Sequence, residues 1–162
     1  MTALRPYRFA AAAALLALLL PAAGLIAAGS ASAQPQPTLP RVQLQAGIHL
    51  ISAEVASDHN TRARGLMFRE RLGSNQGMRF VFTEKATQCF WMRNTLIPLS
   101  IAFIDDQGQI VNIADMQPRS DDSHCSAAPI RLALEMEQGW FAKRGIAPGT
   151  TIGGLSAVPA AR

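Results

Sequence analysis

One segment in the middle of the chain carries side chains suited to bind a ligand. Across residues 89–99 an apolar stretch ends in three consecutive hydrogen-bonding side chains, Arg93, Asn94 and Thr95. Pro98 follows, and because proline lacks a backbone donor it marks a break before the next strand. The alternation of side chains along a strand would place Arg93 and Thr95 on one face and Asn94 on the other. The segment therefore predicts a polar cluster at the rim of an apolar sheet, which suits binding but names no ligand or reaction.

Charge balance links this cluster to an acid further along the chain. The charge of Arg93 must leave the core or meet an acid, because an unpaired buried charge is costly. Glu135 lies between Leu134 and Met136 and is the polar face of an otherwise apolar strand. We therefore expect Arg93 and Glu135 to be coupled. The predicted binding recess consists of five residues: Arg64, Arg93, Asn94, Thr95 and Glu135. The alternative is structural, with the same side chains satisfying each other and the loop backbone.

The chain has two cysteines, Cys89 and Cys125. In an oxidising compartment two cysteines in one small domain usually pair, so we predict a disulfide. Two free thiols and a metal or thiol site remain alternatives, since His124 is adjacent and soft ligands suit Cu(I). The methionines lie among apolar residues, where filling gaps in a core is their usual role. We expect no metal and no cofactor. The methionines considered are Met67, Met78, Met92, Met116 and Met136.

No established catalytic pattern appears. The chain lacks Gly-x-Ser-x-Gly, His-Glu-x-x-His and a phosphate-binding loop, so we predict no catalytic residue. An enzyme acting on envelope carbohydrate or peptide stays open as an alternative, with Glu135 and Asp105 as acid and base. A concave pocket holding both carboxylates would favour that alternative, whereas a shallow polar rim would favour a binding protein.

The first 33 residues resemble an export signal. Arg5 and Arg8 precede an apolar stretch, and Ala31-Ser32-Ala33 has the small-x-small pattern of a cleavage site. We expect a signal peptide over residues 1–33 and a mature chain that begins at Gln34. The alternative is an anchor in the inner membrane formed by residues 9–28. Either way the protein is expected in the periplasm or secreted.

The charge argues against nucleic acid as a partner. The formal charge is +4, but Arg5 and Arg8 belong to the leader, which leaves +2 for the mature chain. No cluster of Lys and Arg with interleaved aromatic residues appears. We expect an unidentified envelope ligand or protein as partner, and membrane contact only through an uncleaved signal segment.

The elements that must position these residues are mostly short strands. Residues 34–40 read as a disordered lead-in, 41–154 as a single β-domain and 155–162 as a frayed tail. Asp58 or Ser57 can cap a short helix through Arg64, with Gly65 at its end, and 138–145 suits a helical turn. This pattern predicts a mainly β fold, a single-domain sandwich or barrel. Strands are expected at 42–45, 48–55, 77–82, 88–93, 99–105, 109–116, 131–137 and 150–152.

Four motifs resemble those of domain-of-unknown-function family 192. They are RGLM at 64–67, GMRFVF at 77–82, WMRNT at 91–95 followed by IPL, and LEM at 134–136 followed by Gly139. The resemblance covers about residues 52–153. It implies a compact β-sandwich or jelly-roll-like domain, often exported or membrane-anchored in bacteria, and no settled activity. Many members have Asp after Pro-Leu, where this chain has Ser100. We therefore expect an exported β-domain with a binding or accessory role, or alternatively an envelope enzyme or a copper or thiol handling protein.

Overall fold

The computed structural model describes residues 39–157, which form a mainly β domain. The described residues contain nine strands, one α-helix and two short 3-10 helices. The strands are β1 (Arg41–Ala46), β2 (His49–Ala56), β3 (Gln76–Ala86), β4 (Cys89–Phe90), β5 (Leu99–Ile104), β6 (Ile110–Met116), β7 (His124–Cys125), β8 (Ile130–Glu137) and β9 (Ile152–Gly153). The helices are α1 (His59–Arg64), η1 (Ala142–Arg144) and η2 (Leu155–Ala157).

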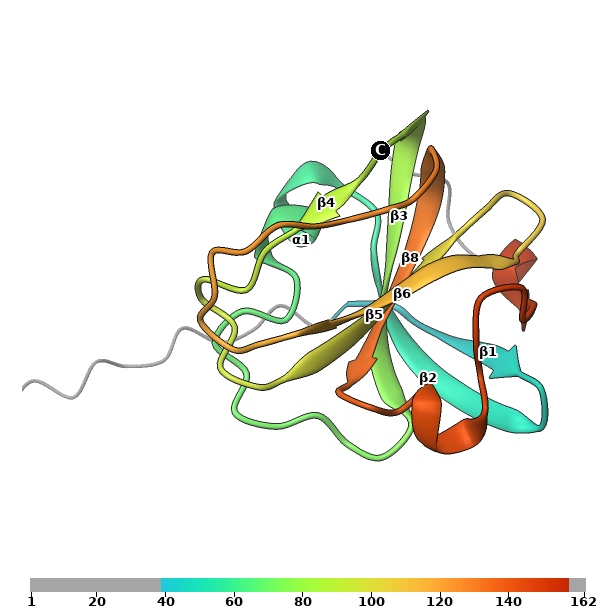
Figure 1. The fold of residues 1–162 in the computed structure, drawn as a ribbon, viewed down its shortest axis with the longest axis horizontal. Helices are drawn as coiled ribbons and strands as arrows, with labels where there is room; N and C mark the ends of the chain where they lie inside the picture. The colour runs from blue at the N-terminus through green and yellow to red at the C-terminus, as the bar shows by residue number, and fades with distance from the viewer. Residues whose placement is uncertain (1–38, 158–162) are drawn as a thin grey trace, which may run out of the picture. The chain divides into compact units, whose positions relative to one another are not determined.

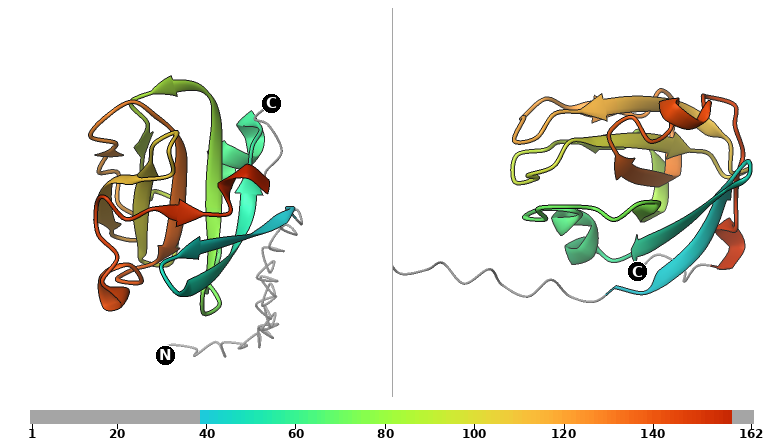
Figure 2. Two further views of the ribbon diagram at one scale, coloured as in Figure 1. Left: turned by 90° about the vertical axis from the view of Figure 1, so that its right-hand side faces the viewer. Right: turned by 90° about the horizontal axis from the view of Figure 1, so that it is seen from below.

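Seven of the strands form a single curled sheet in the order β6-β5-β8-β3-β2-β1-β9 (Figures 1 and 2). All neighbouring pairs are antiparallel except β2 and β3, which are parallel. The two edges of the sheet meet where Gln109 and Thr151 form an isolated bridge. The predicted mainly β domain is confirmed, and its sheet is a half-barrel.

The curled sheet separates two hydrophobic cores. The inner core contains Leu134 and Met136 of β8, and it also holds Trp140 and Phe141 from the segment after that strand. The outer core contains Ala133 of the same strand. Loop residues, Leu66 and Met92 among them, pack over that outer face. On the polar face of β8, Ala133 and Glu135 are buried because the loops cover them, whereas Arg131 and Glu137 are exposed.

The predicted helix is confirmed as α1. Asp58 caps it, because one carboxylate oxygen accepts a hydrogen bond from the backbone N–H of Thr61 at 3.0 Å. The Thr61 hydroxyl accepts in return from the Asp58 backbone N–H, which completes a capping box. Gly65 ends the helix with a positive φ of 48°, and a Cβ at this position would lie 3.3 Å from the Phe80 ring. The tight ending places Arg64 beside the outer core.

The predicted strand over residues 88–93 is wrong beyond Phe90. Strand β4 ends there, and Thr95 donates its backbone N–H to the Met92 carbonyl at 2.9 Å, which closes a turn. Side chains after Phe90 therefore do not alternate as in a strand. Trp91 is 44% exposed, whereas Thr95 is buried.

The ends of the chain are only partly described. The predicted signal peptide, most of the lead-in and residues 158–162 lie outside the described residues. The prediction of a frayed tail is wrong for Leu155–Ala157, which form η2. Among the described helices, none has the length and apolar character needed to cross a membrane.

Candidate binding pocket around Glu135

A pocket of about 340 Å³ lies on the outer side of the sheet and contains one acid, Glu135. The pocket is formed by α1 and the residues after it, β3, β4 and the turn that follows β4. Its polar and charged lining residues are His59, Arg62, Arg64, Thr95 and Glu135. Its apolar lining comes mainly from Leu66, Met67, Phe80, Phe82, Phe90 and Trp91. The cavity therefore combines aromatic and aliphatic walls with several polar groups, a composition that suits a small-molecule site.

Glu135 is buried without a counter-charge. Its register partners are Met78 of β3 and Ile101 of β5, both fully buried apolar residues. Within the described residues, no hydrogen bond or ion pair reaches its carboxyl group, and the residue is only 5% exposed. Burial disfavours the charged form and raises the pKa of Glu135 to about 8. At neutral pH this side chain is therefore mostly a protonated carboxylic acid, which can both donate and accept a hydrogen bond.

Strand alternation explains why this acid faces the pocket. Leu132, Leu134 and Met136 face the inner core, so Ala133 and Glu135 must face the outer one. Glu135, which the sequence indicated as a site residue, therefore lines a pocket because the surrounding loops enclose the outer face of β8.

Two other predicted recess residues share the pocket with Glu135. Arg64 is the last residue of α1, and its buried Nε–H has no hydrogen-bond partner among the described residues. Thr95 is buried, and its backbone carbonyl accepts a hydrogen bond from Arg119 N–H at 3.1 Å. The structure thus brings Arg64, Thr95 and Glu135 to one cavity.

Arg93 lies elsewhere, and the predicted coupling with Glu135 is wrong. Its Nε is 2.6 Å from a carboxylate oxygen of Asp121, and the two side chains are 56% and 66% exposed. Its guanidinium also stacks 4.2 Å from the centre of the Trp91 ring. The turn after Phe90 directs Arg93 to the surface, so its charge is solvated and needs no buried acid.

Asn94 is not a lining residue of the pocket but supports one of its walls. Its side-chain amide lies 3.8 Å from the sulfur of Met67, and its backbone carbonyl accepts from Phe68 N–H at 2.9 Å. It therefore holds the segment after α1 against the turn after β4. This is the structural role that the sequence left open as an alternative.

The aromatic walls were not predicted as site residues. The Phe90 ring meets Phe80 edge-on with centroids 4.9 Å apart, and Phe82 at 6.1 Å. The Arg62 guanidinium lies 5.5 Å from the Phe82 ring centre. Alternation in β3 places Phe80 and Phe82 on one face, but only the tertiary structure shows that a cavity remains between them and α1.

The predicted disulfide between Cys89 and Cys125 is confirmed, and it joins β4 to β7. Their Cα atoms are 4.0 Å apart, and the bridge ties the turn after β4 to the loop before β8. With both sulfurs in a disulfide, neither cysteine supplies the thiolate that the copper or thiol alternative requires. Within residues 39–157, no three His, Cys, Asp or Glu side chains cluster as metal ligands.

The acid–base pair of the enzyme alternative is not assembled. Asp105 stabilises its own turn, because one carboxylate oxygen accepts from the backbone N–H groups of Gln107 and Gln109 at 3.0 and 2.8 Å. It does not line the pocket, where Glu135 is the single carboxylate among the described lining residues. Ser100 also lies apart, since its hydroxyl donates to Asp115 and accepts from Gly139 N–H.

The fold and pocket define a small mainly β domain built around one enclosed acid. Residues 42–154 match the family described as Uncharacterized ACR, domain of unknown function 192. The chain belongs to this family, as its motifs indicated. No curated protein matches the chain.

Two solved structures share the fold. One is described as a candidate transcription regulator from Sinorhizobium meliloti 1021, with 31% identity and a TM-score of 0.69, and the match covers 74% of this chain and 98% of that one. The other is a protein of unknown function from Novosphingobium aromaticivorans DSM 12444, with 33% identity and a TM-score of 0.69. That match covers 77% of this chain and 93% of the other. Both are similar over nearly their whole length.

Proposed function

We propose that this protein is an exported binding module that takes up a small, largely apolar ligand in the Glu135 pocket. The observation that carries the proposal is an unpaired carboxyl group buried in an aromatic-walled cavity of about 340 Å³. Burying a polar group without a partner costs free energy, and a ligand that supplies the partner recovers part of that cost.

The protonation state of Glu135 narrows the ligand class. A neutral carboxyl group both donates and accepts, so its best complement is an amide or another group that does the same. The apolar walls then suit an aliphatic or aromatic body attached to that group. An envelope peptide fragment with an amide end satisfies both requirements. Export rests on the signal-like first 33 residues, and the periplasm is the proposed location.

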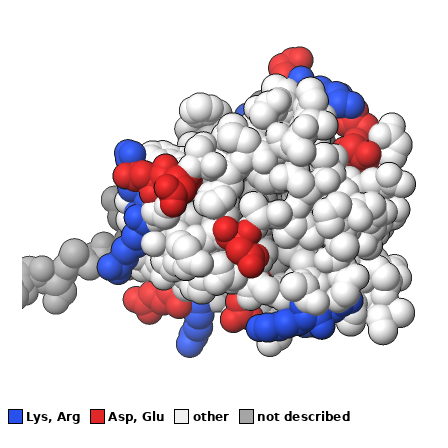
Figure 3. All heavy atoms as spheres, in the orientation of Figure 1, with Lys and Arg blue, Asp and Glu red and all other residues white. Residues whose placement is uncertain are grey.

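Nucleic acid remains an unfavoured partner. Acidic and basic side chains are interspersed on the face in Figure 3, with one acidic group near its centre, and this face shows no large area of basic side chains. A strongly basic surface is the usual electrostatic footprint of a nucleic-acid-binding domain.

A thermal-shift screen tests the proposal, because a ligand that binds only the folded state raises its melting temperature. The panel contains small apolar amides, muropeptides, envelope sugars and metal ions. We expect amide-bearing apolar compounds to stabilise the wild type and the Glu137→Gln variant but not Glu135→Leu. Glu137 is the matched control, because it is an exposed acid two residues further along β8. Stabilisation of Glu135→Leu equal to that of the wild type would contradict the proposal.

The pH dependence of the affinity gives a second test. With a pKa of about 8, Glu135 loses its proton between pH 6 and pH 9, so an amide ligand should bind roughly tenfold more weakly at pH 9. Isothermal titration calorimetry at both pH values measures this change. A ligand bound through a cationic amine would show the opposite trend, since it prefers the ionised acid.

A further inference from the structure

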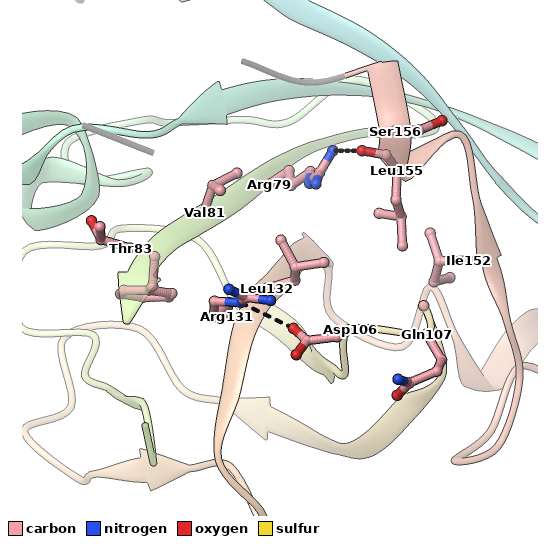
Figure 4. Close-up of a pocket in the computed structure, with 12 residues that line it drawn as sticks. Arg79, Val81, Thr83, Asp106, Gln107, Arg131, Leu132, Ile152, Leu155 and Ser156 are labelled. Carbon is pink, nitrogen blue, oxygen red and sulfur yellow. Dashed lines mark hydrogen bonds and ion pairs between the residues drawn. The ribbon is translucent and has the colours of Figure 1, made fainter. Parts of the chain in front are cut away.

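A second cleft, of about 670 Å³, opens on the inner side of the sheet near η2. Figure 4 shows its lining, which comes from β3, β8, the turn between β5 and β6, and the segment that begins at β9. Its walls include Val81, Leu132, Ile152 and Leu155. Leu132 and Leu155 pack against the inner core, to which Ile152 belongs. The cleft therefore extends that core on one side, and polar residues complete its lining, among them Thr83, Asp106, Gln107, Arg131 and Ser156.

Arg79 lines this cleft, although it is only 3% exposed. Its register partners in the sheet are Val55 and Leu134, which are buried apolar residues. No acid of the described residues pairs with it. Burial lowers the pKa of Arg79 to about 10, which still leaves the guanidinium charged at neutral pH. An unpaired buried charge costs free energy, so Arg79 is unfavourable at this position unless an anion pairs with it.

The hydrogen bonding of Arg79 leaves one edge of the guanidinium without a protein partner. Its Nη1 donates to the Leu155 carbonyl at 3.0 Å, as the dashed line in Figure 4 shows. Neither its Nε nor its Nη2 has a hydrogen-bond partner among the described residues. The Nε–H and Nη2–H bonds point to the same side of a guanidinium. That edge is the fork which pairs with the two oxygens of a carboxylate.

The other charges around the cleft favour a singly charged anion. Asp106 is already shared by Arg131 at 3.1 Å and Lys85 at 3.3 Å. Among the charged residues that line the cleft, Asp106 is negative and Arg79 and Arg131 are positive, which leaves one net positive charge. Because Arg131 is paired, Arg79 is the guanidinium left without an acid. One open fork matches the single charge and planar shape of a carboxylate better than a phosphate.

We propose that this cleft binds a carboxylate carried on an apolar body, with the Nε and Nη2 edge of Arg79 as the anchor. The apolar walls contact the body, and the opening beside Arg131 and Asp106 admits it. This site lies on the opposite face of the sheet from Glu135 and is independent of the function proposed above.

Octanoate is the probe that tests the proposal, with 1-octanol as an uncharged analogue of the same chain length. Calorimetry on the purified protein measures both affinities, and nitrogen-15 NMR follows the side-chain Nε–H of Arg79. We expect saturable octanoate binding, a shift of the Arg79 Nε–H signal, and binding of 1-octanol weaker by about tenfold or more.

Substitutions of Arg79 and Arg71 separate anchoring of the carboxylate by the Arg79 guanidinium from a general effect of positive charge. Arg79→Met should weaken octanoate binding by about tenfold or more, and Arg79→Lys should weaken it less, because it keeps the charge but loses the fork. Arg71→Met is the matched control, because it removes the same charge at an exposed residue outside the cleft lining. Glu135→Leu should also leave octanoate binding unchanged, which separates this site from the Glu135 pocket.

Wild-type affinity for octanoate in Arg79→Met would overturn the proposal. Equal affinity for octanoate and 1-octanol, or the absence of saturable binding to the wild type, would overturn it as well. The NMR signal of Arg79 in the wild type keeps the test valid if Arg79→Met fails to fold, because a binding isotherm without a change in that signal excludes Arg79 as the anchor.

Discussion

Three buried charged or ionisable residues of this domain differ in how they are satisfied. Glu54 is buried and paired with Arg41 at 2.7 Å and with Arg69 at 2.5 Å. Glu135 and Arg79 have no counter-charge among the described residues, and each lines a cavity. A buried charged side chain that is paired within the protein needs no ligand to account for it. A buried ionisable side chain that is unpaired and faces a cavity is a candidate ligand-binding group. This contrast distinguishes the two proposed sites from the ion pairs of Glu54.

Glu135 should make the stability of the protein depend on pH. Its pKa is about 8 in the folded state against an ordinary value of 4.5, so between these pH values the folded state holds a proton that the unfolded state has lost. Stability from this group is therefore fully present below about pH 4.5 and is lost as the pH rises toward 8. We expect a loss of roughly 2–5 kcal/mol across this window. Urea unfolding at several pH values measures it.

The variant Glu135→Gln isolates this contribution, because glutamine keeps the shape and cannot ionise. Its free energy of unfolding should fall less between pH 5 and pH 8 than that of the wild type. Glu137→Gln serves as control and should retain the wild-type slope. Equal slopes for the wild type and Glu135→Gln would mean that the acid titrates normally.

Arg93 should contribute little to stability. The exposed ion pair with Asp121 is screened by water, and such pairs contribute about 0–1 kcal/mol. We expect Arg93→Ala to lower the free energy of unfolding by less than about 1 kcal/mol, rather than the several kcal/mol that loss of a buried pair would cause. Chemical denaturation measures the difference. A loss of several kcal/mol would indicate a buried role that the exposed geometry does not provide.

At the scale of elements, the short β4–β7 sheet decides where the pocket wall stands. Two residues from each strand pair in register, with Cys89 opposite Cys125 and Phe90 opposite His124. Phe90 contributes to the pocket wall and also meets the Phe103 ring of the outer core at 5.8 Å. A two-residue ladder has little stability of its own. The disulfide therefore supplies a covalent link that keeps β4 and β7 paired.

Removal of the disulfide should destabilise the domain and loosen the pocket. The bridge closes a loop between residues 36 apart, which corresponds to about 3–4 kcal/mol in the chain-entropy account. We expect this loss in the double variant Cys89→Ser/Cys125→Ser, measured by chemical denaturation. Hydrogen exchange should rise in β4 and β7 more than in β3 and β8. Unchanged stability would show that the loop is held by its other contacts.

At the scale of the whole molecule, closure of the half-barrel depends on a narrow seam. Beyond the bridge between Gln109 and Thr151, Ile152 donates its backbone N–H to the Gly108 carbonyl at 2.8 Å. The Ile152 side chain is 2% exposed and packs in the inner core. The same side chain lines the Arg79 cleft. The seam thus couples closure of the sheet to the shape of that cleft.

Truncation of Ile152 tests the importance of the seam. We expect Ile152→Ala to lower the free energy of unfolding by about 2–4 kcal/mol, because it leaves a cavity in the inner core. Ile48→Ala is the matched control, since Ile48 is 89% exposed and its truncation should change stability by less than about 0.5 kcal/mol. Thermal and chemical unfolding measure both. Equal effects of the two substitutions would show that the seam is not part of the cooperative core.

The sequence by itself determined what depends on near neighbours along the chain. The strands predicted at 131–137, 99–105 and 109–116 correspond to β8, β5 and β6, and Asp58 and Gly65 marked the ends of α1. Four motifs indicated the family, and the presence of two cysteines predicted the disulfide between them. These features follow from backbone geometry, capping and composition, which act over a few residues.

Only the tertiary structure decided which polar residues are buried and which meet. Alternation cannot distinguish a solvent-facing side of a strand from one that distant loops cover, so only the tertiary structure shows the cavity that encloses Glu135. The turn after Phe90 sends Arg93 to Asp121, a contact that no spacing specifies. Arg79 was not predicted as a site residue, because it is one polar residue in an otherwise apolar strand. The curled sheet buries its charge beside a cleft. Burial and charge pairing depend on segments far apart in the chain, and these meet only when the sheet closes.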